Sequence, residues 1–544
     1  MKPIIEIANS IGLTEDFLIP YGKYKAKISL DALKVTEGRP KGKLVVVTGI
    51  TPTPAGEGKT TTAVGLVQGI GKLGRKAVAT LREPTLGPIY GIKGGGTGGG
   101  KARVLPEDEI NIHFTGDAHA VASAHNLLAA LVDNAVYRNQ ITDLDPTGIQ
   151  WSRVTDASDR ALRNIVSGIG GSNNSPLRET RFDIVSASEI MAILALSSDL
   201  NDLRNRVSRI VVGTTRGGDP VTVESLNIIG SLMTVLRHTI MPNLVQTQEG
   251  QPALIHAGPF GNIAHGCNSI IADRMGLSYA DFVITEAGFG SDLGFEKFMH
   301  IKARQSGLTP SAVVLVASAR ALKYHGGVTR RNLDQPNADA VIAGGPNLAH
   351  HINIIKGFGL PAVVAINRFG QDTKEELDAV AQIAQDSGAE AAVHATGFAD
   401  GGDGMTELAD SVIKATGIGS QIEYAYDLND SVENKVLSLA RKVYGAGEVN
   451  WSPEARRRLR YYESQGWGNL PICMAKTHLS ISHDPTKKGR PSGYPFPIAD
   501  IRASVGAGFL YALAGRIETL PGLPSLPRAL DMDVDDSGNI IGFE

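Results

Sequence analysis

A short segment rich in threonine and glycine, TPTPAGEGKTTT at 51–62, has the residue types and spacing that bind phosphate. It follows an apolar run, Leu44–Thr48, and precedes a segment with apolar residues at helical spacing. In a strand–loop–helix arrangement, backbone N–H groups converge on phosphate oxygens and the helix N-terminus adds partial positive charge. We therefore expect Lys59 to lie between the β- and γ-phosphates of a nucleotide, and the Thr60 hydroxyl to reach a Mg²⁺ ion.

This segment departs from the usual phosphate-binding pattern at one position. The pattern has a glycine five residues before Gly58, and this chain has Thr53 there, between Pro52 and Pro54. Two rigid prolines can replace the conformational freedom of that glycine. The alternative is a glycine/proline turn before an ordinary helix. The preceding strand, the following helix and the GKT triplet favour the phosphate-binding loop.

Charged residues follow at the end of the next predicted strand. Lys76–Leu81 is a second apolar run and ends in Arg82-Glu83. Open α/β sheets bind ligands at the carboxyl ends of their strands, so we interpret this pair as functional, although a surface ion pair is the alternative. Asp117 lies at a predicted helix start, four residues after His113. A helix cap or a contact to a substrate amine is a better interpretation of Asp117 than a metal pair, because no third ligand is evident.

A glycine-rich run, GIKGGGTGGG at 91–100, separates these two sets of charged residues. It cannot bury apolar surface, so we expect it to be mobile. The sequence does not distinguish a lid or phosphate-approach loop from a plain connection.

Three phenylalanines lie in glycine-containing loops just after predicted strands: Phe289, Phe369 and Phe398. Any one of them would be a core residue by default. Three of them at strand ends favour a flat aromatic ligand held between rings.

The order of apolar runs and helical segments predicts an α/β fold with a mostly parallel, doubly wound sheet like that of P-loop NTPases. Further strands are expected at Ile210–Thr214, Ala253–Ala257, Phe282–Thr285, Val313–Ala317, Ala362–Ile366 and Ala391–Ala395. Trp151–Arg209 is expected to be largely helical. We expect a nucleotide-binding core at 1–364, a second smaller α/β domain at 365–525 that contributes the later phenylalanine loops, and a C-terminal segment at 526–544 that packs on the rest.

Composition excludes several classes of protein. The 544 residues carry a net charge of −3, so no electrostatic footprint for nucleic acid or an anionic membrane is present. No apolar run approaches the ~18 residues of a membrane span. The first residues, MKPIIEIANSIG, lack the features of a signal peptide. We expect a cytoplasmic enzyme.

The cysteines also fit a reducing compartment, because Cys267 and Cys473 are the only two in the chain. Cys473 and His478 could suggest a thiol nucleophile, but no third orienting group is evident. We therefore expect both cysteines to be buried and unreactive.

These motifs together resemble those of the formate–tetrahydrofolate ligase (10-formyltetrahydrofolate synthetase) family: TPAGEGKTT, LREPTLGP, INIHFTGD, RETRFDI, NIAHGCNS, TEAGFGSDLG, INRFG, LPICMAKT and TLPGLP. The resemblance runs from about residue 45 to the C-terminus. It is to the monofunctional form, because there is no room for the dehydrogenase/cyclohydrolase module that precedes this unit in some eukaryotic relatives.

The resemblance implies a two-step reaction in one-carbon metabolism. ATP phosphorylates formate, giving formyl phosphate and ADP, and the N10 amine of tetrahydrofolate then attacks the formyl carbon and releases phosphate. Phosphorylation is needed because formate is a poor electrophile, and the transfer itself depends on positioning and charge neutralisation. The resemblance also implies a homotetramer and activation by a monovalent cation, K⁺ or NH₄⁺.

The resemblance assigns roles to the charged residues. The ATP-binding loop would consist of Thr53, Pro54, Ala55, Gly56, Glu57, Gly58, Lys59 and Thr60, with Mg²⁺ on Thr60. Arg82 would clamp formyl phosphate with its planar guanidinium. Glu83 and Asp117 match positions near the folate, where they would bind the pterin or accept the N10 proton. The sequence does not separate those two roles.

The resemblance also assigns the phenylalanines to the folate. Phe289 would lie near the intermediate and the folate, and Phe369 would form one face of a pterin sandwich. Phe398 would form the other face, where the family usually has a tryptophan, and Asp400 replaces a common lysine. A phenyl ring offers less stacking area than an indole, so weaker folate affinity is expected.

Two alternatives share part of this pattern. A P-loop switch protein that hydrolyses ATP would also tolerate the deviant loop position, but it has no need of pterin-stacking phenylalanines. A ligase of another carboxylate would keep Lys59 and Arg82 and bind a different nucleophile.

Overall fold

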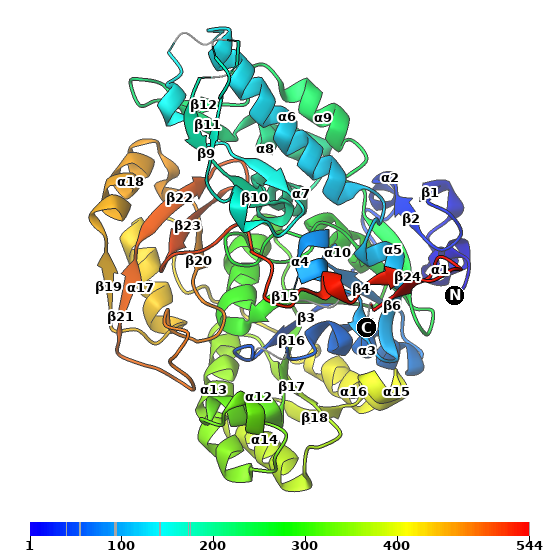
Figure 1. Cartoon of the computed structure of the whole chain (residues 1–544). Helices are drawn as coiled ribbons and strands as arrows, with labels where there is room; N and C mark the ends of the chain where they lie inside the picture. Colours follow the sequence, from blue (N-terminus) through cyan, green and yellow to red (C-terminus); the bar gives the residue numbers. More distant parts are fainter. Residues whose placement is uncertain are drawn as a thin grey trace.

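The computed structural model describes residues 1–39, 41–53, 56–91, 95–140, 143–171, 173–174 and 176–542. Its centre is a twelve-stranded sheet in the order β1-β2-β13-β14-β4-β15-β3-β16-β17-β18, with β6 and β5 attached beside β13 (Figure 1). All neighbours from β14 to β18 are parallel, whereas β1, β2, β13 and β14 pair antiparallel at one side. The predicted mostly parallel α/β sheet is therefore confirmed.

The strands of this sheet are β1 (Leu18–Pro20), β2 (Ala26–Ile28), β3 (Lys43–Gly49), β4 (Ala77–Leu81), β5 (Gly98–Gly99), β6 (Ala102–Leu105), β13 (Asn243–Thr247), β14 (Pro252–Ile255), β15 (Phe282–Gly290), β16 (Ala312–Ala317), β17 (Ala362–Asn367) and β18 (Ala391–Ala395). The helices around it are α1 (Ile4–Ile11), α2 (Asp31–Lys34), α3 (Lys59–Lys72), α10 (Ile270–Tyr279), α12 (Ala319–His325), α13 (Ala338–Gly357), α14 (Lys374–Asp386) and α16 (Thr406–Ala415). Three further helices pack on one another beside the sheet: α6 (Asp117–Tyr137), α7 (Glu189–Leu196) and α8 (Leu200–Ser208). Shorter or peripheral helices are α4 (Leu86–Gly91), α5 (Glu107–Asn111), α9 (Ile229–Leu236), α11 (Arg304–Ser306), α15 (Gly397–Asp400), α17 (Val432–Lys442) and α18 (Pro453–Ser464).

The central strands are apolar on both faces because helices cover both sides. In β3, Leu44 and Val46 belong to the core formed with α6, α7, α10, α12 and α13, whereas Val45 and Val47 belong to the core formed with α3 and α16. Alternate side chains of a strand point to opposite faces, so a run without polar alternation predicts a strand that is buried twice. This explains why β3, β15, β16 and β17 were recognisable from sequence.

The prediction that Trp151–Arg209 is largely helical is wrong in its first half. The described part of this region contains β7 (Arg153–Thr155), β8 (Ile165–Ser167), β9 (Arg178–Thr180) and β10 (Phe182–Ile184), and the helices α7 and α8 follow. β7 pairs with β10 and β8 with β9, outside the main sheet. Three-residue strands leave no readable period, and tertiary pairing decides their structure.

The predicted strand at Ile210–Thr214 forms as β11 (Val211–Thr214) but lies outside the main sheet as well. It pairs with β12 (Pro220–Thr222) as a separate two-stranded unit.

The C-terminal part adds two small sheets on the left of Figure 1 and a separate two-stranded sheet on its right. Their strands are β19 (Glu448–Trp451), β20 (Ile472–Ala475), β21 (Pro495–Ile498), β22 (Asp500–Ser504), β23 (Phe509–Leu513), β24 (Asp533–Val534) and β25 (Ile540–Ile541). The turn Arg528–Leu530 lies against α4. β17 crosses residue 365, so strands from both sides of the expected domain boundary share one sheet. The expected division into domains stays a prediction.

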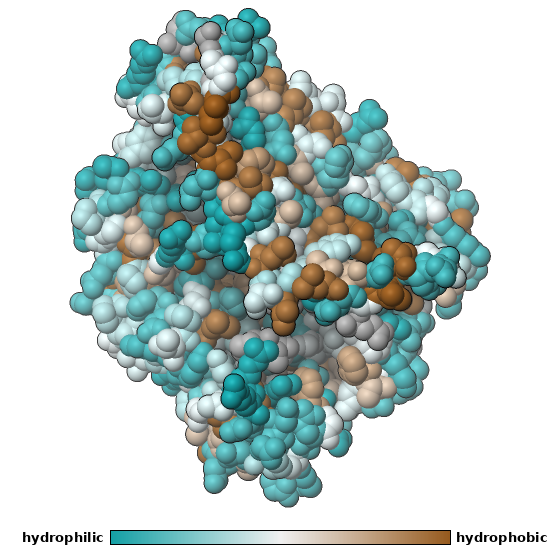
Figure 2. Space-filling model, viewed as in Figure 1, coloured by the Kyte–Doolittle hydropathy of each residue, from teal (hydrophilic) through white to brown (hydrophobic). Residues whose placement is uncertain are grey.

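The outer surface is mixed in character. Figure 2 shows a mostly hydrophilic face with a few separate apolar patches. One such set of exposed apolar side chains lies near the β8–β9 pair and the end of α6, and consists of Tyr137, Val166, Ile169 and Leu177. Within the described ranges, none of the helices has the length and apolar composition needed to cross a membrane.

Candidate functional site

The loop between β3 and α3 has the strand–loop–helix connection expected of a phosphate-binding loop. Gly56 and Gly58 have φ angles of 78° and 73°, which glycine adopts without strain, and α3 begins at Lys59. Glu57 is buried inside the loop, where its two carboxylate oxygens accept hydrogen bonds from the Thr53 backbone N–H (2.9 Å) and the Ser318 hydroxyl (3.1 Å). The unusual Thr53 is thus held by a carboxylate within the loop.

Two members of the predicted ATP site, Pro54 and Ala55, lie outside the described residues. Thr60 follows Lys59 in the first turn of α3. Among the described residues, no three His, Cys, Asp or Glu side chains are grouped so that they could hold a metal ion.

Lys59 and Arg82 form a pair of neighbouring cations. Burial lowers the pKa of Lys59, the carboxylates of Glu57 and Glu286 oppose that shift, and the charge of Arg82 adds to it. The Arg82 guanidinium lies beside Gly288, where a Cβ atom would come within 3.3 Å of its Nη2. Two neighbouring cations, one at the start of α3 and one just after β4, attract an anion with several oxygen atoms. The structure therefore brings together these two residues, which were predicted from separate motifs.

Glu83 and Asp117 form a second cluster together with Lys27. The Nζ atom of Lys27 lies 2.8 Å from each oxygen of Asp117 and 3.1 Å from the carbonyl oxygen of Met241. Asn243 donates a further hydrogen bond of 2.8 Å to Oδ2 of Asp117. Both oxygens of this carboxylate are therefore occupied by protein donors. Asp117 also begins α6, where the helix dipole favours negative charge.

Glu83 has no comparable set of donors. Its Oε2 atom is buried without a hydrogen-bond partner among the described residues. Burial raises the pKa of Glu83 well above the usual carboxyl range, the charge of Asp117 adds to the shift, and the Lys27 ammonium opposes it. One buried ammonium thus serves two buried carboxyl groups, and Glu83 is the carboxyl that remains available to a ligand.

Lys27 is the residue of this cluster that sequence reasoning missed. It lies on β2, in register with Asn243 on β13, and both side chains reach Asp117. Lys23 and Lys25 precede it at alternate positions, and the three resemble the solvated face of an edge strand. The one usable signal in the sequence was the pair of apolar neighbours, Ala26 and Ile28. In the structure, Lys27 is only 1% exposed.

The three predicted phenylalanines lie outside the main core. Phe289 is half-buried at the end of β15, with a φ of 60°, and its ring stacks on His478 with centroids 4.8 Å apart and planes inclined by 21°. Phe369 is half-buried after β17, and Phe398 is 62% exposed on α15. No ring contact joins any two of the three within the described part of the chain. They are available to a ligand without forming a preassembled sandwich.

Phe398 is linked to the glycine-rich run that the sequence left open. Its carbonyl oxygen accepts the Lys101 backbone N–H at 2.9 Å, and a Cβ atom at Gly100 would lie 2.1 Å from that carbonyl oxygen. A Cβ at Gly99 would lie 3.2 Å from the Phe398 ring. The end of the run therefore needs glycine because the Phe398 segment packs directly on it. The rest of the run includes residues 92–94, which lie outside the described residues.

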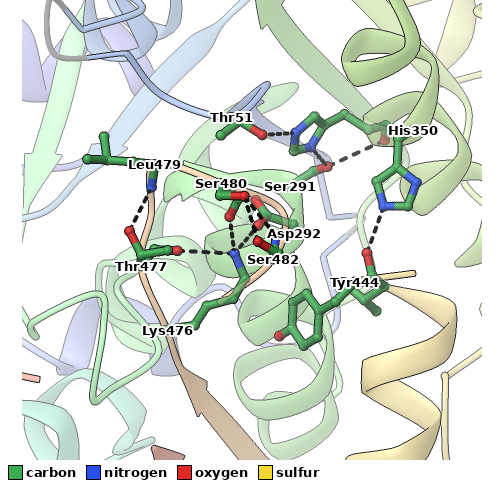
Figure 3. A network of polar contacts seen from close by, with 12 residues as sticks. Thr51, Ser291, Asp292, His350, Tyr444, Lys476, Thr477, Leu479, Ser480 and Ser482 are labelled. Atoms are coloured by element: carbon green, nitrogen blue, oxygen red, sulfur yellow. Dashed lines mark hydrogen bonds and ion pairs between the residues drawn. The ribbon is translucent and has the colours of Figure 1, made fainter. Parts of the chain in front are cut away.

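A buried ion pair joins Asp292, three residues after Phe289 in the sequence, to Lys476; Figure 3 shows the two paired side chains. Nζ of Lys476 is 2.6 Å from Oδ2 of Asp292, and both side chains are at most 1% exposed. The two cysteines are also buried, and burial raises the pKa of each thiol to about 11. The prediction that they are buried is confirmed, and such thiols are poor nucleophiles at neutral pH.

Comparisons with known proteins extend over the whole chain. The family model for formate–tetrahydrofolate ligase matches residues 1–544. The formate–tetrahydrofolate ligase of Desulforamulus reducens is 52% identical, with 100% of this chain and 97% of the relative covered. That of Roseiflexus castenholzii is 52% identical (100% and 98% covered), and that of Thermotoga petrophila is 50% identical, with both chains fully covered. The chain therefore belongs to the formate–tetrahydrofolate ligase family.

Proposed function

We propose that this chain ligates formate to tetrahydrofolate at the expense of ATP, with its cation pair and its carboxyl pair acting on different steps. In the first step, a formate oxygen attacks the γ-phosphorus of ATP, giving formyl phosphate and ADP. In the second, the N10 amine attacks the formyl carbon, the bond from that carbon to the phosphoryl oxygen breaks, and phosphate and a proton leave. The family membership over the full chain carries the overall reaction.

The first step is assigned to the loop at 53–60 and to Lys59. Backbone N–H groups of the loop and the start of α3 hold the phosphates of ATP, and Lys59 contacts their oxygens. Thr60 is assigned to the Mg²⁺ ion that arrives with ATP. The cation pair of Lys59 and Arg82 is the single observation that best supports this placement, because neither cation has an ion-pair partner among the described residues.

Arg82 is assigned to formyl phosphate. A planar guanidinium can hold the acyl and phosphoryl oxygens together, and it balances charge that develops in both transfers. We expect Arg82→Ala to leave ATP binding nearly intact and to reduce turnover by at least about 100-fold, as for other lost anion-stabilising donors. Isothermal titration with a non-hydrolysable ATP analogue and a steady-state assay test the two effects separately. Unchanged turnover would remove Arg82 from the mechanism.

The carboxyl pair is assigned to the second step, with unequal roles. Asp117 is held by Lys27 and Asn243, which supports a fixed anion. Glu83 has a free buried oxygen and a raised pKa, which supports a group that accepts the N10 proton. This separation of roles was not accessible from the sequence.

The phenylalanines are assigned to the folate, with Phe289 near the intermediate and Phe369 and Phe398 on the pterin. Phe398→Ala is expected to raise KM for tetrahydrofolate by about 3- to 10-fold and Phe398→Trp to lower it, because ring area sets stacking energy. KM for ATP should change in neither variant. Equal changes for both substrates would argue against stacking.

The overall reaction is tested by ADP release from Mg-ATP, with formate and tetrahydrofolate omitted one at a time. Both substrates should be required, and 10-formyltetrahydrofolate should accumulate. ADP release without either would favour the switch ATPase instead. If the reaction required another carboxylate in place of formate, the chain would be a ligase of that carboxylate.

Three further properties belong to this proposal. The exposed apolar set near β8 and β9 supports an assembly of copies, which we propose is a homotetramer, and light scattering measures its mass. Activation by K⁺ or NH₄⁺ is proposed without assigned residues, and a comparison with tetramethylammonium tests it. Free, buried cysteines are compatible with a cytoplasmic location, which fractionation tests.

A further inference from the structure

The buried ion pair Asp292–Lys476 joins two segments of the chain that are far apart in sequence. Besides its 2.6 Å contact with Asp292, Nζ of Lys476 donates to the carbonyl oxygens of Thr477 (3.1 Å) and Ser480 (2.6 Å) (Figure 3). The ring of Tyr444 lies 5.3 Å from the same nitrogen. All three N–H donors of the ammonium are therefore used. The pair fixes the start of the loop at 477–482 against the segment that follows β15.

The two stacked rings are attached close to this ion pair. Phe289 lies three residues before Asp292, and His478 lies two residues after Lys476. Their planes are inclined by only 21°, with the centroids 4.8 Å apart. Phe289 is also one of few non-glycine residues with a positive φ, and this backbone conformation persists only where the surroundings enforce it. The ion pair and the stack together supply such surroundings.

A second set of hydrogen bonds ties the same segment to the nucleotide-binding loop. Nδ2 of Asn347 donates to Oγ1 of Thr51 (2.9 Å), which lies 2.9 Å from Nε2 of His351. Nδ1 of His351 lies 2.7 Å from the hydroxyl of Ser291, next to Asp292 (Figure 3).

The direction of this chain of hydrogen bonds follows from the charge of the imidazole. Burial lowers the pKa of His351 to about 3, so the ring is neutral and has one donor and one acceptor nitrogen. Asn347 donates to Thr51, which leaves the Thr51 hydroxyl hydrogen for Nε2, and Nδ1–H then donates to Ser291. The segment after Phe289 is thus fixed from two sides, by the nucleotide-binding loop and by Lys476.

We propose that His478 is a positioning residue for the folate substrate and acts through Phe289. Its ring covers one face of Phe289, and the Asp292–Lys476 pair holds the two rings parallel, so that Phe289 is kept in place for contact with a flat heteroaromatic ring. This inference rests on the proposed role of Phe289. It assigns a function to a residue that sequence reasoning considered only as a partner of Cys473, a thiol that is buried and unreactive.

The proposal is tested by His478→Ala and His478→Phe, with His483→Ala as the matched control. His483 lies in the same segment, and its ring contacts Tyr494 and Phe496 instead of Phe289. Steady-state kinetics give KM for tetrahydrofolate, ATP and formate, and thermal unfolding gives the stability of each variant. His478 is half-buried and outside the core, so its replacement should leave the folding of the chain intact.

His478→Ala should raise KM for tetrahydrofolate by about 3- to 10-fold, the loss expected for one aromatic stack, and leave KM for ATP within about twofold. His478→Phe should restore the wild-type value, and His483→Ala should not change it. An unchanged KM in His478→Ala, a parallel rise for ATP, or a failure of phenylalanine to rescue would each overturn the proposal. Failure of the proposed function would show earlier, as a wild-type chain that forms no 10-formyltetrahydrofolate.

Discussion

Two of the buried ion pairs of this chain have the same chemistry and opposite effects on the carboxyl groups around them. Lys27–Asp117 and Lys476–Asp292 have contacts of 2.8 and 2.6 Å, and all four side chains are at most 4% exposed. In the first pair, a further carboxyl, Glu83, lies beside the same ammonium, and its pKa is raised well above the usual range. In the second, burial acts to raise the pKa of Asp292, but the charge and the hydrogen bond of Lys476, together with the neighbouring His351 and His350, outweigh it and hold the pKa below its ordinary value.

The difference is one of charge balance. In the Asp292–Lys476 pair, one ammonium and one carboxylate balance each other's charge and fix two segments. One ammonium and two carboxyls leave a surplus negative charge, which favours a proton on the less well solvated member. The same type of contact thus joins two segments beside Phe289 and leaves a carboxyl with a raised pKa beside α6.

The largest expected effect comes from Glu83→Gln, which tests the surplus carboxyl directly. Glutamine keeps the shape and cannot take a proton, so turnover should fall by about 10²- to 10⁴-fold. The wild-type rate should rise with pH through the raised pKa of Glu83, because only the carboxylate accepts a proton, and the variant should lose this dependence. Stopped-flow or steady-state assays across pH 5–9 measure both effects.

Glu189→Gln is the matched control for that variant. Burial raises the pKa of Glu189 to about 7, but its Oε1 accepts the backbone N–H groups of Gly506 and Ala507, away from the cation pair. Its replacement should leave turnover unchanged. If both variants lost turnover to a similar degree, the loss would reflect the general effect of altering a buried carboxyl on stability. Glu83 would then have no special role.

The next effect is expected from Lys27→Met, which removes the shared ammonium. Two buried carboxyls without a cation should cost about 3–5 kcal/mol of unfolding free energy. The rate should also require a higher pH, since the pKa of Glu83 rises further without the opposing charge. Urea unfolding and the pH–rate profile measure these changes. Lys34→Met, which removes the ammonium of the exposed Lys34–Asp31 pair in α2, is the control and should change neither stability nor the pH–rate profile.

The double variant Lys27→Met/Asp117→Asn distinguishes charge from packing. It should recover much of the lost stability, because no unpaired charge remains at Asp117, without recovering turnover. Recovery of neither would contradict the charge-balance explanation.

These two pairs also mark the limit of what the sequence could predict. β3, β15, β16 and β17 were predicted because their apolar runs are buried on both faces. Lys59, Arg82, Glu83 and Asp117 were nominated by motifs at strand and helix ends, and their roles stay predictions. The contacts that distinguish Glu83 from Asp117 could not be predicted from the sequence. Lys27 and Asp117 are 90 positions apart, and the pairing of β2 with β13 brings them together.

A smaller effect is expected from Asp292→Asn, which leaves Lys476 buried without its carboxylate. The loss of stability should be about 3 kcal/mol, at the lower end for a broken buried pair, because Lys476 keeps two carbonyl acceptors. Turnover well below the unfolding temperature should stay within about threefold, in contrast to Glu83→Gln, whereas KM for tetrahydrofolate should rise with the loosened Phe289. A turnover loss as large as that of Glu83→Gln would mean that the two pairs do not differ in function.

The smallest effect concerns pH, and it compares the neutral histidine beside each pair. Burial lowers the pKa of His256 to about 4 and that of His351 to about 3. The charges of Asp117 and Lys27 also act on His256, and that of Asp292 acts on His351. Below about pH 6.5, each of these histidines binds a proton in the unfolded chain but not in the folded chain. Each should therefore lower the free energy of unfolding by roughly 1 kcal/mol per pH unit as the pH falls below 6.5. The loss should continue to about pH 4 for His256 and about pH 3 for His351. In urea unfolding at pH 7.0, 6.0 and 5.0, His351→Gln should show a shallower pH dependence than the wild type by that amount. An unchanged slope would mean that His351 already carries a proton in the folded chain, and the assigned direction of its hydrogen bonds from Thr51 to Ser291 would then be wrong.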